Sequence, residues 1–161
     1  MKEPLFLIIR GQCNCGKTTL CAEIYSELLK HVNQEHIFGE PYKEMEKISK
    51  NAIVYENGSP LDFKTILPKG DKKIGIMSRG DVVDDCFIKS LSELLQQKVN
   101  ILICCTRSLN RENSTFRYIE EHYKNYQKKE FWVEYAEDKT KKQIVKQKQA
   151  KKIVEYILNE L

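Results

Sequence analysis

The chain has 161 residues, enough for one domain with a sizeable core and too many for a disulfide-stapled miniprotein. Hydrophobic residues make up 41% and charged residues 31%, with 7 Gly and 4 Pro, which excludes a disordered or fibrous chain. The formal charge of +4 comes from seven lysines between Lys139 and Lys152, without which it would be −3, so whole-chain charge does not indicate a nucleic-acid partner.

The apolar runs and the cysteines indicate the cellular compartment of the protein. The apolar run over residues 5–9 is too short for a signal peptide, and no run approaches the roughly 20 apolar residues of a membrane-spanning helix. Of the six cysteines, Cys104 and Cys105 lie inside an apolar run, which favours free thiols in a reducing compartment. We therefore expect a cytoplasmic protein with no membrane partner.

The first predicted unit is a strand, a loop and a helix. Residues 5–9 are continuously apolar and predict a strand, and residues 10–16 form a glycine-bounded loop. Over residues 17–29, Leu20, Ile24 and Leu28 recur four residues apart, which predicts a helix with one buried stripe. The helix would begin directly at the loop.

The next region predicts an antiparallel pair. Residues 31–50 are polar, and a short helix is expected over residues 42–48. Strands are expected over residues 52–55 and 63–67, on either side of a turn in which Asn57-Gly58 tolerates positive φ. We expect this hairpin at a sheet edge.

The remaining elements alternate between strands and helices. They are a strand over 73–78, a helix over 82–97, a strand over 99–105, an amphipathic segment over 115–126, a strand over 131–135 and a helix over 139–161. Such alternation predicts a single α/β domain, residues 1–161, with a three-layer fold. Its sheet would be mainly parallel with right-handed crossovers and an antiparallel edge hairpin.

The motif that suggests chemistry lies at the first loop. Residues 11–18 fit the pattern G-x-x-x-x-G-K-[ST], after a predicted strand and at the start of a predicted helix. Backbone N–H groups of such a loop bind phosphate oxygens, and a side chain at Gly11 or Gly16 would obstruct the turn or the polyphosphate. The helix N-terminus adds partial positive charge. On this motif the chain resembles the P-loop NTPase superfamily, as a small kinase-like member.

The resemblance implies that the protein binds ATP and Mg²⁺. Lys17 would reach the β- and γ-phosphates, Thr18 would ligate Mg²⁺ through its hydroxyl, and Thr19 would contact the α-phosphate. Asn14 stands where many small-molecule kinases carry another glycine, an exchange that its tolerance of left-handed backbone makes acceptable. The expected nucleotide-binding residues are Gly11, Asn14, Cys15, Gly16, Lys17, Thr18 and Thr19.

An acidic residue at the end of a neighbouring strand usually completes the Mg²⁺ site of P-loop proteins. Asp81 follows the strand predicted over residues 73–78 and is the expected acid, beside Thr18, for both metal binding and catalysis. The alternative is that Gly80-Asp81 forms a turn or the N-cap of the next helix. Asp84 and Asp85 are expected in the first turn of that helix, where its dipole favours acids.

Arginines follow another predicted strand. Arg107 comes after the strand over residues 99–105, with Arg111 and Arg117 further on. A phosphoryl-transfer site needs guanidinium groups to neutralise developing charge, although each arginine could equally be a solvated loop residue. The expected catalytic residues are thus Lys17, Asp81 and Arg107.

Two other features have plainer interpretations. Cys13 and Cys15 lack the second pair that a structural zinc site needs, so loop packing is expected, with oxidation that blocks phosphate binding as a hypothesis. Glu56 lies in a region where nucleoside and shikimate-type kinases often carry the acid that orients the acceptor, but beside Asn57-Gly58 a hairpin residue is the favoured interpretation.

The lysines near the C-terminus are interpreted in the same way. Val145, Ile153, Ile157 and Leu161 share one face of the predicted last helix, which indicates a docking helix whose lysines cover its solvated side. Binding of nucleic acid is the less favoured interpretation, because the run lacks interleaved aromatic residues.

Three functions of different classes follow from the motif. The first is a small ATP-dependent phosphotransferase with an unknown small-molecule or protein acceptor. The second is a nucleotide-dependent switch or ATPase subunit that acts through a protein partner or a dimer, and a binding module with a degenerate loop is a third. The chain has no Asn-Lys-x-Asp tetrapeptide that would read guanine, so ATP is the expected nucleotide.

Overall fold

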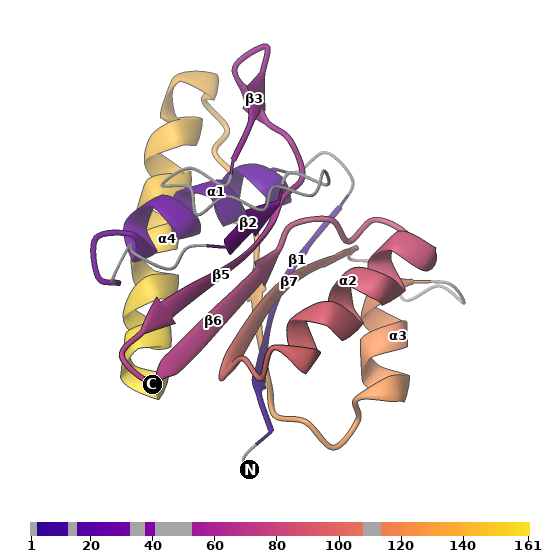
Figure 1. Ribbon diagram of the computed structural model, residues 1–161. Helices are drawn as coiled ribbons and strands as arrows, with labels where there is room; N and C mark the ends of the chain where they lie inside the picture. The colour runs from indigo at the N-terminus through magenta and orange to yellow at the C-terminus, as the bar shows by residue number, and fades with distance from the viewer. Residues whose placement is uncertain (1–2, 13–15, 33–37, 41–52, 108–113) are drawn as a thin grey trace.

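The computed structural model describes residues 3–12, 16–32, 38–40, 53–107 and 114–161 (Figure 1). Its main sheet has six strands among these residues, in the order β2-β5-β6-β7-β1-β8. Their bounds are β1 Leu5–Gly11, β2 Phe38–Glu40, β5 Lys64–Lys69, β6 Lys72–Met77, β7 Ile101–Arg107 and β8 Lys128–Trp132. A separate two-stranded sheet pairs β3 (Tyr55–Glu56) with β4 (Ser59–Pro60).

Four neighbouring strands of the main sheet are parallel. β6 pairs with β7, β7 with β1, and β1 with β8 in this sense. β1 is therefore an internal strand, which explains why Phe6, Leu7, Ile8 and Ile9 are all fully buried instead of alternating with polar residues. The carboxyl end of β1 lies between those of β7 and β8.

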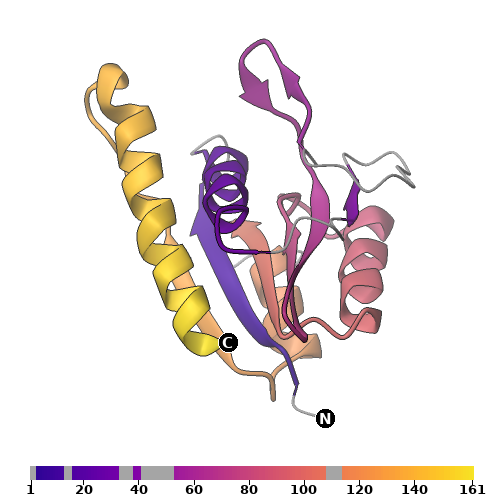
Figure 2. The ribbon, with the colours of Figure 1, turned by 60° about the vertical axis from the view of Figure 1, so that its left-hand side comes forward.

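Helices cover both faces of the sheet (Figure 2). On one face, α1 (Lys17–Leu28) and α4 (Lys142–Glu160) pack on inward side chains such as Leu7 and Ile9. On the other, α2 (Asp85–Gln96) and α3 (Thr115–His122) pack on Phe6 and Ile8. The alternation of side chains along β1 thus supplies both cores.

The predicted α/β class and its mainly parallel sheet are confirmed, but the expected hairpin partners are wrong. The strand expected over residues 63–67 is β5, and it pairs antiparallel with β6 through a turn at Gly70, whose φ is +61°. Asn57 and Gly58, with φ of 51° and 78°, turn only the short β3–β4 hairpin. The Asn-Gly signal was right about a turn and wrong about which strands it joins.

The remaining elements mostly follow the expected order. β8 ends at Trp132 although the expected strand covered residues 131–135, and the long last helix is preceded by a 3₁₀ turn over Lys139–Lys141. β2 was not expected, and the helix expected over residues 42–48 lies outside the described residues. Within the described ranges, none of the helices is both long and apolar enough to span a bilayer.

Candidate functional site

The side chain of Lys17 is buried between the end of β1 and the start of α1. Gly16 caps α1 with φ +94° and ψ 28°, a left-handed conformation that glycine adopts without steric cost. The Lys17 side chain is only 7% exposed, and its Nζ donates to the carbonyl oxygens of Gly11 at 2.9 Å and Gln12 at 3.3 Å. The ammonium is therefore held at the end of β1, beside the N-terminus of α1.

The hydroxyl of Thr18 is bound by a carboxylate that the sequence analysis did not single out. Thr18 Oγ1 donates to Asp62 Oδ1 at 3.0 Å, and Ser78 Oγ donates to the same oxygen at 3.3 Å. The backbone N–H of Phe63 donates to Ser78 Oγ at 2.8 Å, which fixes the serine. Three side-chain oxygens thus gather at the first turn of α1.

Strand direction explains how Asp62 reaches this place. β5 runs antiparallel to β6, and its first residue, Lys64, lies opposite Met77 at the end of β6. A residue that precedes β5 therefore lies at the same edge of the sheet as residues that follow the parallel strands. Asp62 and Ser78 meet there, next to Thr18.

Asp81 was expected beside Thr18, but it pairs with Lys17 and Arg107, and the Thr18 hydroxyl binds Asp62. One of the Asp81 carboxylate oxygens, Oδ1, lies 3.4 Å from Lys17 Nζ and 3.8 Å from Arg107 Nε. The Asp81 side chain is 53% exposed, and the Arg107 side chain is 34% exposed. The structure thus brings the three residues expected to be catalytic together, with the carboxylate between two cations.

Gly80 allows the chain to cross β7 and deliver Asp81 to Lys17. A β-carbon at Gly80 would overlap the backbone carbonyl oxygen of Cys105. Thr115 Oγ1 donates to the Gly80 carbonyl at 2.6 Å and fixes the crossing from α3. Asp84 is the N-cap of α2, accepting a hydrogen bond from the Phe87 N–H, so the helix start falls after Asp81.

A polar pocket of about 280 Å³ opens beside these groups. It lies at the carboxyl edge of the sheet, where ligands of open α/β folds bind. The β3–β4 hairpin contributes Ser59 to it, so the hairpin forms one wall. The lining residues are Gly16, Lys17, Thr18, Thr19, Ser59, Ser78 and Asp81.

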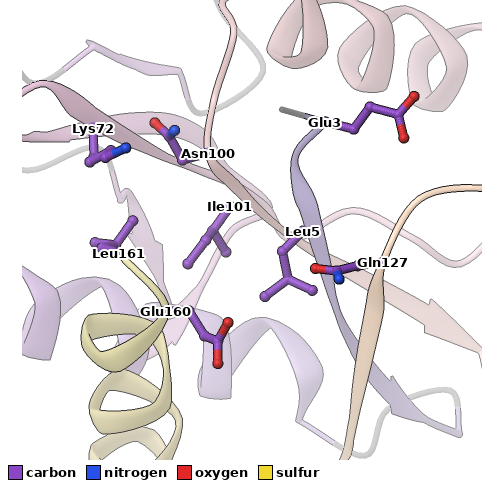
Figure 3. A pocket seen from close by; sticks show the side chains of 8 residues that line it. All are labelled: Glu3, Leu5, Lys72, Asn100, Ile101, Gln127, Glu160 and Leu161. Carbon is purple, nitrogen blue, oxygen red and sulfur yellow. The ribbon is translucent and has the colours of Figure 1, made fainter. Parts of the chain in front are cut away.

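Figure 3 shows a second hollow, of about 220 Å³, at the opposite edge of the sheet. It lies where β1 and β7 begin, between Leu5, Ile101 and the end of α4. The side chains of Asn100 and Gln127 line this hollow. Their backbone carbonyls accept hydrogen bonds from the N–H groups of Leu5 and Phe6. The groups around this hollow hold strand ends together, and it lies at the edge of the sheet opposite Lys17, Asp81 and Arg107.

The other residues singled out by sequence are dispersed. Arg117 lies on α3 and pairs with Glu121 at 3.2 Å, and Glu56 lies in the β3–β4 hairpin as expected. Cys13, Asn14, Cys15 and Arg111 lie outside the described residues, so their expected roles stay predictions. In the part of the chain that is described, no cluster of three or more His, Cys, Asp or Glu side chains could hold a metal.

Three cysteines are buried in the cores on the two faces of the sheet: Cys21 and Cys105 on one face and Cys104 on the other. Cys21 of α1 and Cys105 of β7 touch, with their sulfur atoms 3.2 Å apart. The hydrogen bond between Cys21 and Cys105, and then burial, raise the pKa of Cys105 well above its ordinary value. Burial likewise raises the pKa of Cys104. Cys104 and Cys105 therefore stay protonated, and together with Cys21 they pack as small apolar side chains.

Comparison with known proteins adds no relative: no family model, no curated protein and no solved structure matches the chain. Function is therefore inferred from the residues themselves.

Proposed function

We propose that this protein is a P-loop protein that binds ATP and Mg²⁺ and acts as a small phosphotransferase. The observation that carries the proposal is the placement of Lys17, Asp81 and Arg107 around the N-terminus of α1, beside a polar pocket. Lysine, arginine and helix N–H groups are the donors that bind polyphosphate. The four parallel strands, with the motif on an internal one, support the three-layer P-loop type of fold.

The residues beside Thr18 fit a magnesium ion. Mg²⁺ prefers oxygen ligands, and here a hydroxyl and a carboxylate lie 3.0 Å apart at the start of α1. Thr18 would hold the ion directly, and Asp62 would orient that hydroxyl and any ion-bound water. Mg²⁺ would supply neutralisation of phosphate charge. Asp81 remains the expected second acid, since it lines the same pocket.

The chain's own groups suggest how transfer would proceed. In the structure, Asp81 occupies the position of an anion, bound to Lys17 and Arg107 through one oxygen. Phosphate oxygens would take over both cations, and the two positive charges would then stabilise charge on the transferring group. The released carboxylate of Asp81 would accept the proton of an acceptor hydroxyl in the pocket.

Calorimetric titration with ATP, with and without Mg²⁺, tests the binding step. We expect Lys17→Ala to weaken ATP binding at least about a hundredfold, because a buried, charge-assisted partner of the phosphates is lost. Lys17→Met keeps the buried stem and controls for folding. Lys30→Ala, at an exposed residue just after the far end of α1, is the matched lysine control. Unchanged affinity in both Lys17 variants would overturn the proposal.

Release of ADP then separates the two classes of function. Dependence on a small hydroxyl or phosphate acceptor would identify a phosphotransferase. Stimulation by a protein partner or by dimerisation, with no acceptor, would instead favour a nucleotide-dependent switch or ATPase subunit.

A further inference from the structure

Lys146 of α4 lies against the backbone of Gly16. A β-carbon built on Gly16 would lie 2.8 Å from Lys146 Cε and 3.3 Å from Lys146 Nζ. Lys146 Nζ also donates to the carbonyl of Glu134 at 3.1 Å, in the connection between β8 and α4. A lysine from the far end of the sequence thus reaches the loop that holds Lys17.

Helical spacing explains why this lysine differs from its neighbours. Ala150, Ile153 and Ile157 face α1 in the core, and Lys146 continues their stripe one turn toward the start of α4. It is partly buried, whereas the lysines of the solvated side are exposed: Lys141, Lys142, Lys148, Lys151 and Lys152. The expectation that this run only covers a solvated face therefore does not hold for Lys146.

Two helix N-termini add partial positive charge near Lys146. Helix N-termini carry partial positive charge, and proteins usually place acidic side chains or caps there. α1 has neither a side-chain cap nor an acidic residue in its first turn. α4 also lacks both and begins after Lys141. Lysines 17 and 146 thus add positive charge where two helices already supply it.

We propose that Lys146 is a second polyphosphate-binding cation, which acts with Lys17 on the phosphates of a nucleoside diphosphate or triphosphate. This inference rests on the function proposed above. The Lys146 ammonium lies against Gly16 of the proposed phosphate-binding loop, so its charge would act on a phosphate bound there. The interaction needs no rearrangement of α4, because the side chain already lies at the loop.

Titration of the full-length protein with Mg-ATP at low and at high salt tests the proposal. Lys146→Met keeps the aliphatic stem against Gly16 and removes the charge, Lys146→Arg restores the charge, and Lys148→Met is the matched exposed control on the same helix. We expect Lys146→Met to weaken ATP binding about tenfold at low salt, with a smaller loss at high salt because ions screen the interaction. Lys146→Arg and Lys148→Met should bind nearly as the wild type does.

The outcomes separate this inference from the proposed function. Binding of ATP by the wild type, loss in Lys17→Met and no change in Lys146→Met would overturn the role of Lys146 and leave the nucleotide site in place. A loss in Lys146→Met that does not vary with salt, and that Lys146→Arg does not rescue, would also overturn it, because that pattern indicates packing. Absence of ATP binding by the wild type would overturn both.

Discussion

The two edges of the central sheet use polar residues in different ways. At the amino edge, Asn100 holds the ends of neighbouring strands: its side chain accepts from the Lys73 N–H at 2.8 Å and its backbone carbonyl from Leu5 at 3.0 Å. At the carboxyl edge, Lys17 pairs with Asp81 beside a pocket, and Asp62 accepts a hydrogen bond from Thr18. The first arrangement fixes strand register, and the second gathers charges and hydroxyls that a ligand can use.

Gly80→Ala is expected to have the largest effect at the carboxyl edge, on both stability and ATP affinity. The added methyl group would overlap the Cys105 carbonyl, so the crossing over β7 must shift, at a cost of about 1–3 kcal/mol in stability. Because the crossing delivers Asp81 and the β6 end to the site, ATP affinity should fall as well. Chemical denaturation and calorimetry of the same preparation measure both effects.

Gly75→Ala is the matched control for that substitution. Its β-carbon would meet side-chain atoms of Leu102 and Val99 at 3.2 Å, in the middle of the sheet. Stability should fall while ATP affinity is kept. Equal loss of affinity in the two variants would mean that the carboxyl edge is not a distinct functional region.

Asp62→Asn is expected to separate binding from stability. The amide keeps the size of the side chain but removes the charge that orients Thr18 and any water near it. We expect the gain in ATP affinity from Mg²⁺ to shrink about tenfold, the usual size of an outer-sphere effect, with little change in the free energy of unfolding. A Mg²⁺ dependence equal to that of the wild type would assign the metal to Asp81 instead.

Asn100→Ala should give the smallest effect, confined to stability. Loss of its hydrogen bond with the Lys73 N–H should lower the free energy of unfolding by about 1 kcal/mol. ATP affinity should not change, because the residue lies at the amino edge. A change in affinity would show that the two edges are coupled.

Sequence reasoning found the parts of the site that local pattern encodes. Lys17, Asp81 and Arg107 each follow an apolar run or a glycine motif, and they lie together as expected. Asp62 was missed because β5 was paired with the wrong strand, which hid the fact that its start lies at the carboxyl edge. The turn at Gly70 was the signal that could have placed it.

Lys146 was missed for a different reason. The run of lysines resembles a solvated face, and only the stripe through Ala150 and Ile153 distinguishes one of them. Its contact with Gly16 joins segments separated by most of the chain, and no short-range pattern encodes such a contact.

The position of β1 also has a consequence for folding during synthesis. The strand that carries the motif is made well before both its neighbours, β7 and β8, which begin only at Ile101 and Lys128. Pairings so distant in sequence close large loops and form slowly. On the ribosome, residues 11–18 would therefore lack their neighbouring strands until residues 101–132 have emerged, and the proposed nucleotide site could not form before then.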